Sequence, residues 1–294
     1  MNPREEHLAT RRAAGLFDFS FMGLYEFLGK SELQALQTRD LDALQPGQIA
    51  YTLLVKDDGA VLIDATVWRR DAERFWLFTG RRSAFGGRDR SGEHAILALQ
   101  GPASGRILSR LIGADAVAAL RYFHFIQNPM LVARLGFSGE LGYELLVPAA
   151  EAPALRQKLL DAGRVDGLRE CGWAAADSLR IESGYVLFDR EIDGRANPSE
   201  LGLERLAGKS FEVRKKLVGL EILDGPAPAR LPAAEVTSEC VSPTLGKPIA
   251  LGFAAADSRP EDLVRLDDGR IARVAQLPFY DAERRRPRAA PIRG

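Results

Sequence analysis

Apolar and polar residues alternate over short runs in the first half of the chain, a pattern typical of strands mixed with short helices. The clearest case is a hairpin, with strands at 51–55 and 61–68 around the turn Asp57-Asp58-Gly59, since Asp-Gly turns favour tight strand reversal. A second hairpin is predicted from strands at 131–135 and 143–147 across Ser138-Gly139. The other elements predicted here are strands at 16–28 and 74–79, helices at 4–14, 32–44, 102–113, 151–162 and 173–183, and a loop at 81–94.

The pattern changes near residue 210, after which short runs of apolar residues alternate with Pro- and Gly-rich turns. The strands predicted there are 217–222, 249–254, 263–266 and 270–276, with a loop at Pro226 and Pro228 and a hairpin turn at Asp267-Asp268-Gly269. Closely spaced short strands without a long helix favour a small barrel or sandwich. We therefore predict an α+β region at 1–210 and a C-terminal β domain at 211–294.

Composition narrows the class of protein. The 294 residues are 46% apolar and 27% charged, with 40 basic and 40 acidic residues, so no net positive field favours nucleic acid. The tail around 284–288 is rich in arginine and is most simply a solvated end. Two cysteines suit a reducing compartment, and neither a signal peptide nor an apolar run of membrane-spanning length is present. We predict a cytoplasmic protein that binds neither nucleic acid nor membranes; its oligomeric state stays open.

Most catalytic signatures are missing from the sequence. The three histidines, His7, His94 and His124, do not stand at metal-ligand spacing, so no metal site is expected. No nucleophile elbow, phosphate-binding glycine loop or dinucleotide fingerprint occurs. Any chemistry must then rest on carboxylates and on a bound cofactor.

Two carboxylates stand where strands usually carry apolar residues. Asp64 lies between Ile63 and Ala65, although aspartate is depleted in strand interiors. Glu144 shares a strand face with Leu146, and a carboxylate in apolar surroundings is costly unless it is paired. Taken alone, both also fit the wet face of a half-exposed sheet. By the same reasoning Asp177 and Arg180 fit a plain pair within a helix, and Tyr51, Trp68 and Trp76 fit core positions.

Several stretches, in order along nearly the whole chain, resemble the T-protein of the glycine cleavage system, the tetrahydrofolate-dependent aminomethyltransferase. They are Glu6-His7-Leu8-Ala9 through Asp18, Leu99-Gln100-Gly101-Pro102, Gly136 through Glu144, Ala175 through Tyr185, Glu191-Ile192-Asp193, Val236-Thr237-Ser238, Ser242 through Leu245, and Pro278-Phe279-Tyr280. The resemblance implies two interlocked α+β units that form a folate cleft, and a C-terminal β-barrel.

The resemblance also implies roles for individual residues. Asp64 falls where the family keeps the carboxylate that faces the reacting nitrogens of tetrahydrofolate, so it is the predicted catalytic residue. Glu144 falls where a carboxylate grips the pterin ring, whose adjacent N–H donors suit a two-point acceptor. The remaining predicted folate-binding residues are Tyr51, Trp76, Met22, Tyr185 and Arg180.

The chain departs from the family pattern at several positions. Ala176 replaces an arginine expected to meet the anionic tail of folate, Gly80 replaces an asparagine, and Phe21 replaces the histidine of an S-H-M motif. The segment 80–100 is short, and the signature of the iron–sulfur-assembly branch is absent around Lys209-Ser210-Phe211. Restoring a cation with Ala176→Arg is expected to raise affinity for the tail, with Arg180 and Arg205 as the nearest other basic groups.

We therefore predict an enzyme that transfers a one-carbon unit to tetrahydrofolate from a small-molecule or lipoyl-carried donor. A folate-dependent demethylase is the rival within this class. A non-catalytic folate-binding accessory protein is the alternative from another class, and a protein that has lost folate binding is the third. Asp64 discriminates among them, because a pure binder has little use for an acid beside the reactive nitrogen.

Overall fold

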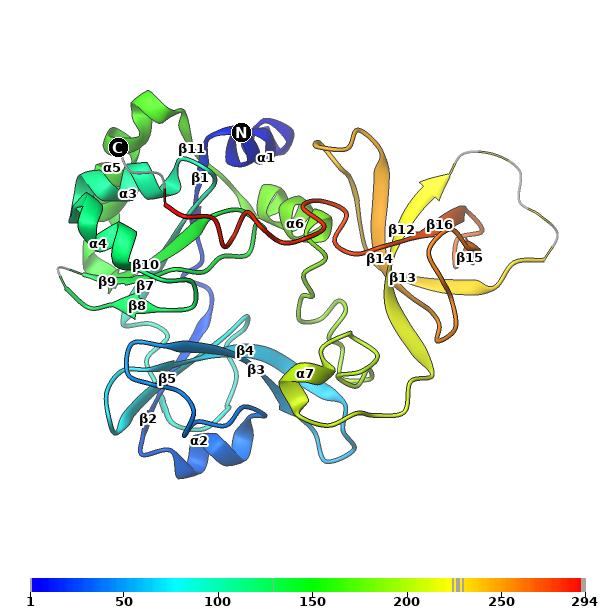
Figure 1. Ribbon diagram of the computed structural model, residues 1–294, viewed down its shortest axis with the longest axis horizontal. Coiled ribbons are helices and arrows are strands. Elements are labelled where there is room, and N and C mark those ends of the chain that lie inside the picture. The colour runs from blue at the N-terminus through cyan, green and yellow to red at the C-terminus, as the bar shows by residue number, and fades with distance from the viewer. Residues whose placement is uncertain (1, 129, 224, 226–227, 229, 292–294) are drawn as a thin grey trace.

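The computed structural model describes residues 2–128, 130–223, 225, 228 and 230–291 and contains two open sheets and a closed barrel (Figure 1). This is the α+β architecture expected from the sequence. The predicted division at residue 210 stays a proposal; the first barrel strand begins at Lys215. No helix among the described residues is long and apolar enough to cross a bilayer.

A five-stranded sheet forms the first unit, in the order β3-β4-β5-β2-β6. Its strands are β2 (Gly23–Leu28), β3 (Ile49–Val55), β4 (Val61–Arg69), β5 (Arg74–Thr79) and β6 (Arg88–Asp89), with the helices α2 (Ser31–Leu36) and α7 (Glu204–Ala207) nearby. The predicted hairpin of β3 and β4 is confirmed, and its register sets Leu53 opposite Asp64 and Tyr51 opposite Thr66.

A six-stranded sheet forms the second unit, in the order β11-β1-β7-β10-β9-β8. Its strands are β1 (Ala14–Asp18), β7 (His94–Gln100), β8 (Phe125–Ile126), β9 (Leu131–Ala133), β10 (Gly142–Pro148) and β11 (Leu168–Glu170). One face packs against α3 (Ser104–Ile112), α4 (Ala114–Ala119) and α5 (Ala152–Gly163), with 3-10 turns at Ala149–Glu151 and Arg164–Asp166. The other face meets the five-stranded sheet through a shared apolar core.

The C-terminal strands close on themselves in the order β12-β14-β13-β15-β16. They are β12 (Lys215–Leu223), β13 (Ala233–Val241), β14 (Pro248–Ala255), β15 (Leu263–Leu266) and β16 (Ile271–Ala275). The hairpin at Asp267-Asp268-Gly269 joins β15 to β16 as expected. Pro228 lies between β12 and β13, and Pro226 lies outside the described residues.

Two predicted elements are wrong in detail, and the strands β7 and β13 were not predicted. The single strand at 16–28 is two strands in different sheets, β1 and β2, because the chain turns at Ser20, whose backbone N–H donates to the Asp18 carboxylate. The helix at 32–44 ends at Leu36, where the Gln34 side chain bonds the backbone of the following bend instead. The strand β13 was missed because its exposed and buried positions do not alternate regularly.

A polar junction with a buried centre connects the N-terminal helix α1 (Pro3–Arg12), the helix α6 (Trp173–Glu182), the barrel and the tail. We use this name for His7, Arg11, Glu140, Glu182, Thr244 and Tyr280. Arg11 pairs with Glu140 and with Glu182, at 3.1 and 2.9 Å. His7 and Thr244 also bond Glu182, and Tyr280 donates to Glu140. These contacts bring together segments from both ends of the chain.

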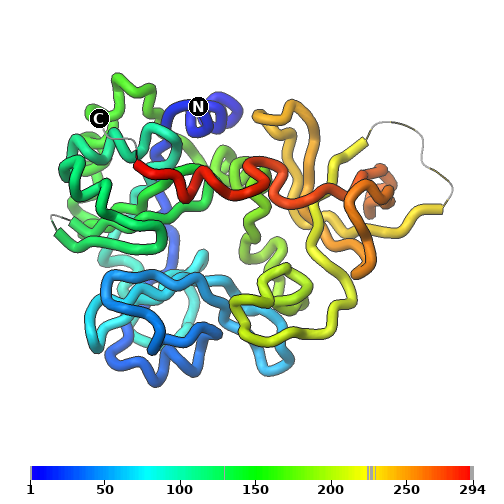
Figure 2. Tube along the Cα trace, viewed as in Figure 1, coloured from blue at the N-terminus to red at the C-terminus, as the bar shows by residue number. Residues whose placement is uncertain are grey.

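The tail does not run free after the barrel. Figure 2 shows it returning from the barrel across the upper side of the molecule toward α3. Arg134 donates to the Ala289 carbonyl, and Pro291 packs against Gly105 of α3. The prediction of a simple solvated end is therefore wrong, since residues on both sides of the arginine run are anchored.

Candidate functional site

The main cavity lies where the two sheets face each other and has a volume of about 590 Å³. Strands β3, β4 and β5 contribute to one side, β10 to another, and the segment 184–188 and the tail close the rest. That segment starts where α6 ends, because Gly184 adopts a φ of 63° and turns the chain, a conformation that favours glycine. Cavities of this size suit a small organic molecule.

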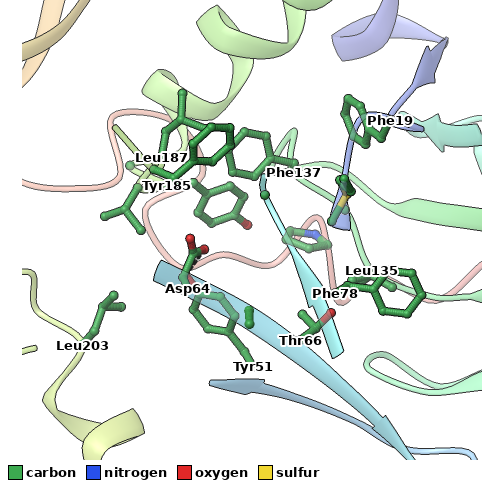
Figure 3. A pocket seen from close by; sticks show the side chains of 18 of the residues that line it. Phe19, Tyr51, Asp64, Thr66, Phe78, Leu135, Phe137, Tyr185, Leu187 and Leu203 are labelled. Atoms are coloured by element: carbon green, nitrogen blue, oxygen red, sulfur yellow. Dashed lines mark hydrogen bonds between the residues drawn. The ribbon is translucent and has the colours of Figure 1, made fainter. Parts of the chain in front are cut away.

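Asp64 faces this cavity from the middle of β4, partly exposed to it. Figure 3 shows its carboxylate between the rings of Tyr51 and Tyr185. The Tyr51 hydroxyl donates to Asp64 Oδ2 at 2.8 Å. Burial raises the pKa of Asp64 to about 6, against the opposing effect of the Tyr51 hydrogen bond, and the charge of Glu191 adds to the rise. The wet-face alternative left open by the sequence does not hold for this residue.

Glu144 faces the same cavity from β10 and is 5% exposed. Its strand neighbours are Ala98 on β7 and Ala133 on β9, which offer no polar side chain. Among the described residues none forms a hydrogen bond with the Glu144 carboxylate. Burial therefore raises its pKa to about 7. A buried acceptor of this kind is costly unless a ligand supplies donors.

Aromatic and sulfur-containing side chains make the walls. Met22, Tyr51 and Tyr185, all predicted from the sequence, line the cavity. Phe137 and Tyr185 stack with ring centroids 6.0 Å apart. Phe188 lies against Gly80, where an added Cβ would come within 2.4 Å of its ring. The phenylalanine thus fills space that a side chain at position 80 would need.

Two arginines of the tail, Arg284 and Arg288, also line the cavity. The Arg284 guanidinium lies 5.3 Å from the Tyr185 ring centroid, and that of Arg288 lies 5.7 Å from the Tyr122 ring centroid. Sequence reasoning missed both. The signal was the basic run at 284–288, but the run alone does not reveal that the anchored tail passes the cavity.

Two predicted site residues lie elsewhere. Arg180 is fully buried at the contact of α6 with the barrel, where it pairs with Glu191 at 2.7 Å and donates to Ser238. It also forms the intrahelical pair with Asp177 that the sequence allowed. Trp76 lines a second hollow beyond the shared core. The predicted placement of both residues in the cleft is therefore wrong. Arg180 points to the barrel, and Trp76 shares a strand face with Phe78 but lies two residues farther along β5, outside the cleft.

The structure also shows where the positions that depart from the family pattern lie relative to the cavity. Ala176 is 3% exposed and packs in the shared core, so Ala176→Arg would bury a charge rather than restore a contact with a ligand. Arg205, the other suggested cation, does not line the cavity. Phe21 and Trp173 do line it, and their rings meet edge to face 5.4 Å apart. They are 42% and 43% exposed, which makes an open apolar mouth.

In the part of the chain that the structure describes, no group of three or more His, Cys, Asp or Glu side chains is placed to hold an ion. The arrangement offers two carboxylates, one buried (Glu144) and one partly exposed (Asp64), together with flat apolar walls and the two arginines of the tail. Such a site can hold a flat, N–H-rich molecule with an anionic end, and can stabilise positive charge near Asp64.

A family model, sequence relatives and a solved structure all match this chain over most of its length. The family model for the GCVT N-terminal domain matches residues 2–210. The aminomethyltransferase of Symbiobacterium thermophilum is 36% identical over 96% of this chain and 90% of its own, and that of Bacillus subtilis is 33% identical over 94% and 90%. The crystal structure of glycine cleavage system aminomethyltransferase T from Bartonella henselae is 27% identical, with a TM-score of 0.81 over 96% of this chain and 90% of that one. This chain therefore belongs to the glycine cleavage T-protein family of aminomethyltransferases.

Proposed function

We propose that the protein is a tetrahydrofolate-dependent aminomethyltransferase. The observation that carries the proposal is the presence of two carboxylates, the buried Glu144 and the partly exposed Asp64, in one cavity of about 590 Å³. They come from facing sheets of a fold shared with proteins of that name.

The residues present fit tetrahydrofolate. Within the described chain the two carboxylate oxygens of Glu144 have no donor and face an apolar wall, which suits the adjacent N–H donors of a pterin. Phe137, Tyr185 and Met22 give surfaces for a flat ring and its aromatic linker. Arg284 and Arg288 bring positive charge to the wall formed by the tail, which suits the glutamate end. We propose that these two arginines bind the anionic tail of folate, the role implied for the family arginine that Ala176 replaces in this chain.

Asp64 is the proposed catalytic residue. Tetrahydrofolate supplies two amines that take a methylene carbon, so positive charge develops on nitrogen during attack. An ionised carboxylate beside that nitrogen stabilises the charge and accepts a proton. With a pKa of about 6, Asp64 is mostly ionised at neutral pH yet basic enough to hold a proton briefly. Tyr51 fixes its orientation through the 2.8 Å hydrogen bond.

The donor is the finer part of the proposal. We propose an aminomethyl group carried on the sulfur of a lipoyl arm. Two folate nitrogens bond to its carbon as the carbon–nitrogen and carbon–sulfur bonds break, which releases ammonia and the lipoyl thiol. The mouth formed by Phe21 and Trp173 is apolar and open, as an aliphatic arm requires. A small methylated donor, as in a demethylase, would make less use of two exposed rings.

A non-catalytic folate-binding protein remains the alternative. It would need Glu144 but not an acid with a raised pKa beside the reactive nitrogen, so the position of Asp64 favours the enzyme. A cytoplasmic location stays a prediction from the sequence.

The test is a calorimetric titration of the protein with tetrahydrofolate, followed by turnover assays with aminomethyl-lipoyl and small methyl donors. We expect one folate per chain and methylene-tetrahydrofolate with release of ammonia from the first donor. Binding without turnover of any donor would favour the accessory protein, and absence of binding would refute both.

A further inference from the structure

A second hollow of about 420 Å³ lies at the other end of the interface between the two sheets. Trp76 of β5 and Leu146 of β10 line it, whereas Phe78 and Glu144, two residues away on the same strands, line the main cavity. Two residues of strand span about 7 Å. The two spaces are therefore separated by one layer of the shared apolar core, which holds Trp76, Phe78 and Leu146.

Arg70, at the end of β4, is the distinctive group of this hollow. Its guanidinium lies 3.9 Å from the Trp76 ring centroid, and its Nε donates to the Gln127 side-chain oxygen at 2.9 Å. No carboxylate within the described ranges forms an ion pair with it, although the chain forms many such pairs. Burial, and then the like charge of Arg74, lower the pKa of Arg70. A stacked, oriented guanidinium without a counter-ion can donate hydrogen bonds to a bound anion.

Two carboxylates, Glu26 and Glu93, line the hollow itself, but both already have partners there. Glu26 accepts from Trp76 Nε1 at 3.2 Å and pairs with Arg90 at 2.8 Å. Glu93 also pairs with Arg90, and Asp71 pairs with Arg74. His94 adds a ring to the same wall, with its Nδ1 unpartnered among the described residues. Within the described ranges Arg70 is thus the arginine of this hollow that no carboxylate engages, and Arg74, although paired with Asp71, adds positive charge beside it.

We infer that this hollow binds a small oxyanion, a phosphate or carboxylate group, with Arg70 as its principal ligand. The planar fork of Arg70 is held on Trp76 and by Gln127, so little side-chain entropy is lost when an oxyanion pairs with its free edge. The site is separate from the proposed folate cleft, and an anion there would lie against Trp76 and Leu146, two residues along the strands from Phe78 and Glu144.

The experiment titrates the full chain by calorimetry with inorganic phosphate and, separately, with succinate, at an ionic strength held constant with sodium chloride. We expect one of the two anions to bind at one site per chain. Arg70→Gln should weaken that binding by at least about tenfold, the usual loss when a charge-assisted hydrogen bond is removed. The anion that binds identifies the group as phosphate or carboxylate.

Two further variants keep the test decisive. Gln127→Glu changes an exposed side chain and sets a carboxylate against Arg70, so it should abolish anion binding even if Arg70→Gln folds poorly. The double variant Arg284→Gln and Arg288→Gln removes the cations of the main cavity and should leave the affinity unchanged. Loss of binding in that double variant would place the anion in the cleft and overturn the inference. So would an absence of heat with both anions, or unchanged affinity in Gln127→Glu.

Discussion

Glu144 and Glu182 are both buried, at 5% and 0% exposure, yet their pKa values are shifted in opposite directions. Burial raises the pKa of Glu144 to about 7, and nothing opposes it. Burial acts on Glu182 too, but the hydrogen bond from His7 and the charge of Arg11 outweigh it and hold the pKa of Glu182 at about 2. The difference comes from the partners and not from the depth of burial.

The comparison distinguishes a carboxylate whose partners come from the protein from one whose partners would come from a ligand. In the polar junction the protein supplies every partner: Arg11, His7, Ser242 and Thr244 surround Glu182. In the cleft the protein supplies none for Glu144 within the described chain. An unpaired buried carboxylate costs stability, and folds keep such groups where function uses them.

The largest effect is expected from Glu182→Gln in the polar junction. The substitution leaves the buried Arg11 guanidinium short of a counter-charge, and breaking one partner of a buried pair costs about 3–5 kcal/mol of unfolding free energy. Urea denaturation at pH 7 measures this. Because the pKa of Glu182 is lowered from 4.5 to about 2, its stabilisation is present above pH 4.5 and is lost as pH falls toward 2. The variant should therefore show a flatter stability profile below pH 4.5; an unchanged profile would contradict the assignment.

Asp64→Asn tests the cleft side of the comparison through turnover. Removing a charge that stabilises developing positive charge typically costs about a hundredfold or more in kcat. Folate affinity should change much less, and stability should stay equal or rise, because the carboxylate is partly desolvated. Single-turnover kinetics and calorimetry measure the two separately. A variant with full activity would make Asp64 an ordinary strand residue.

Glu144→Gln should weaken tetrahydrofolate binding by about 1–3 kcal/mol, the cost of losing charge-assisted hydrogen bonds in a buried site. The fold should tolerate this isostere and gain stability above pH 7. A folded-state pKa raised to about 7 means that the parent loses stability as pH rises from 4.5 through 7. Affinity equal to the parent would show that the pterin lies elsewhere.

The pH dependence of folate binding follows from the same group. If the ligand binds the ionised form of Glu144, affinity should rise by about tenfold between pH 6 and pH 8 and then level off, because the ionised fraction grows from a tenth to nine tenths around a pKa of 7. Glu144→Gln should remove this rise, whereas Glu182→Gln should retain it. Calorimetry at three pH values tests both variants.

The smallest effect is expected at the tail. Arg284→Gln should weaken folate binding by about two- to fivefold at low salt, and Arg288→Gln by less, because Arg288 is more exposed and exposed ion pairs contribute little after screening. For the parent, affinity for mono- and triglutamate folates should differ by less than about threefold. A much stronger preference for the longer tail would mean that further basic groups hold it.

The sequence alone indicated the fold class, the hairpin carrying Asp64 and the strand carrying Glu144, because both carboxylates break a local pattern of apolar residues. It also indicated Met22, Tyr51 and Tyr185, which the structure brings into the same cavity. These features depend on near neighbours in the chain and on motif order, which a linear reading retains.

Tertiary structure alone decided the rest, since it brings together residues far apart in the chain. It removed Trp76 and Arg180 from the cleft, buried Ala176, and carried Arg284 and Arg288 to its wall. The two glutamates show the physical reason. A sequence shows that Glu144 stands on an apolar strand and Glu182 at the end of a helix, but it does not show whether a distant partner reaches either carboxylate; Arg11 is 171 positions from Glu182. Only the folded chain supplies His7 and Arg11 to Glu182 and leaves Glu144 facing an apolar cavity.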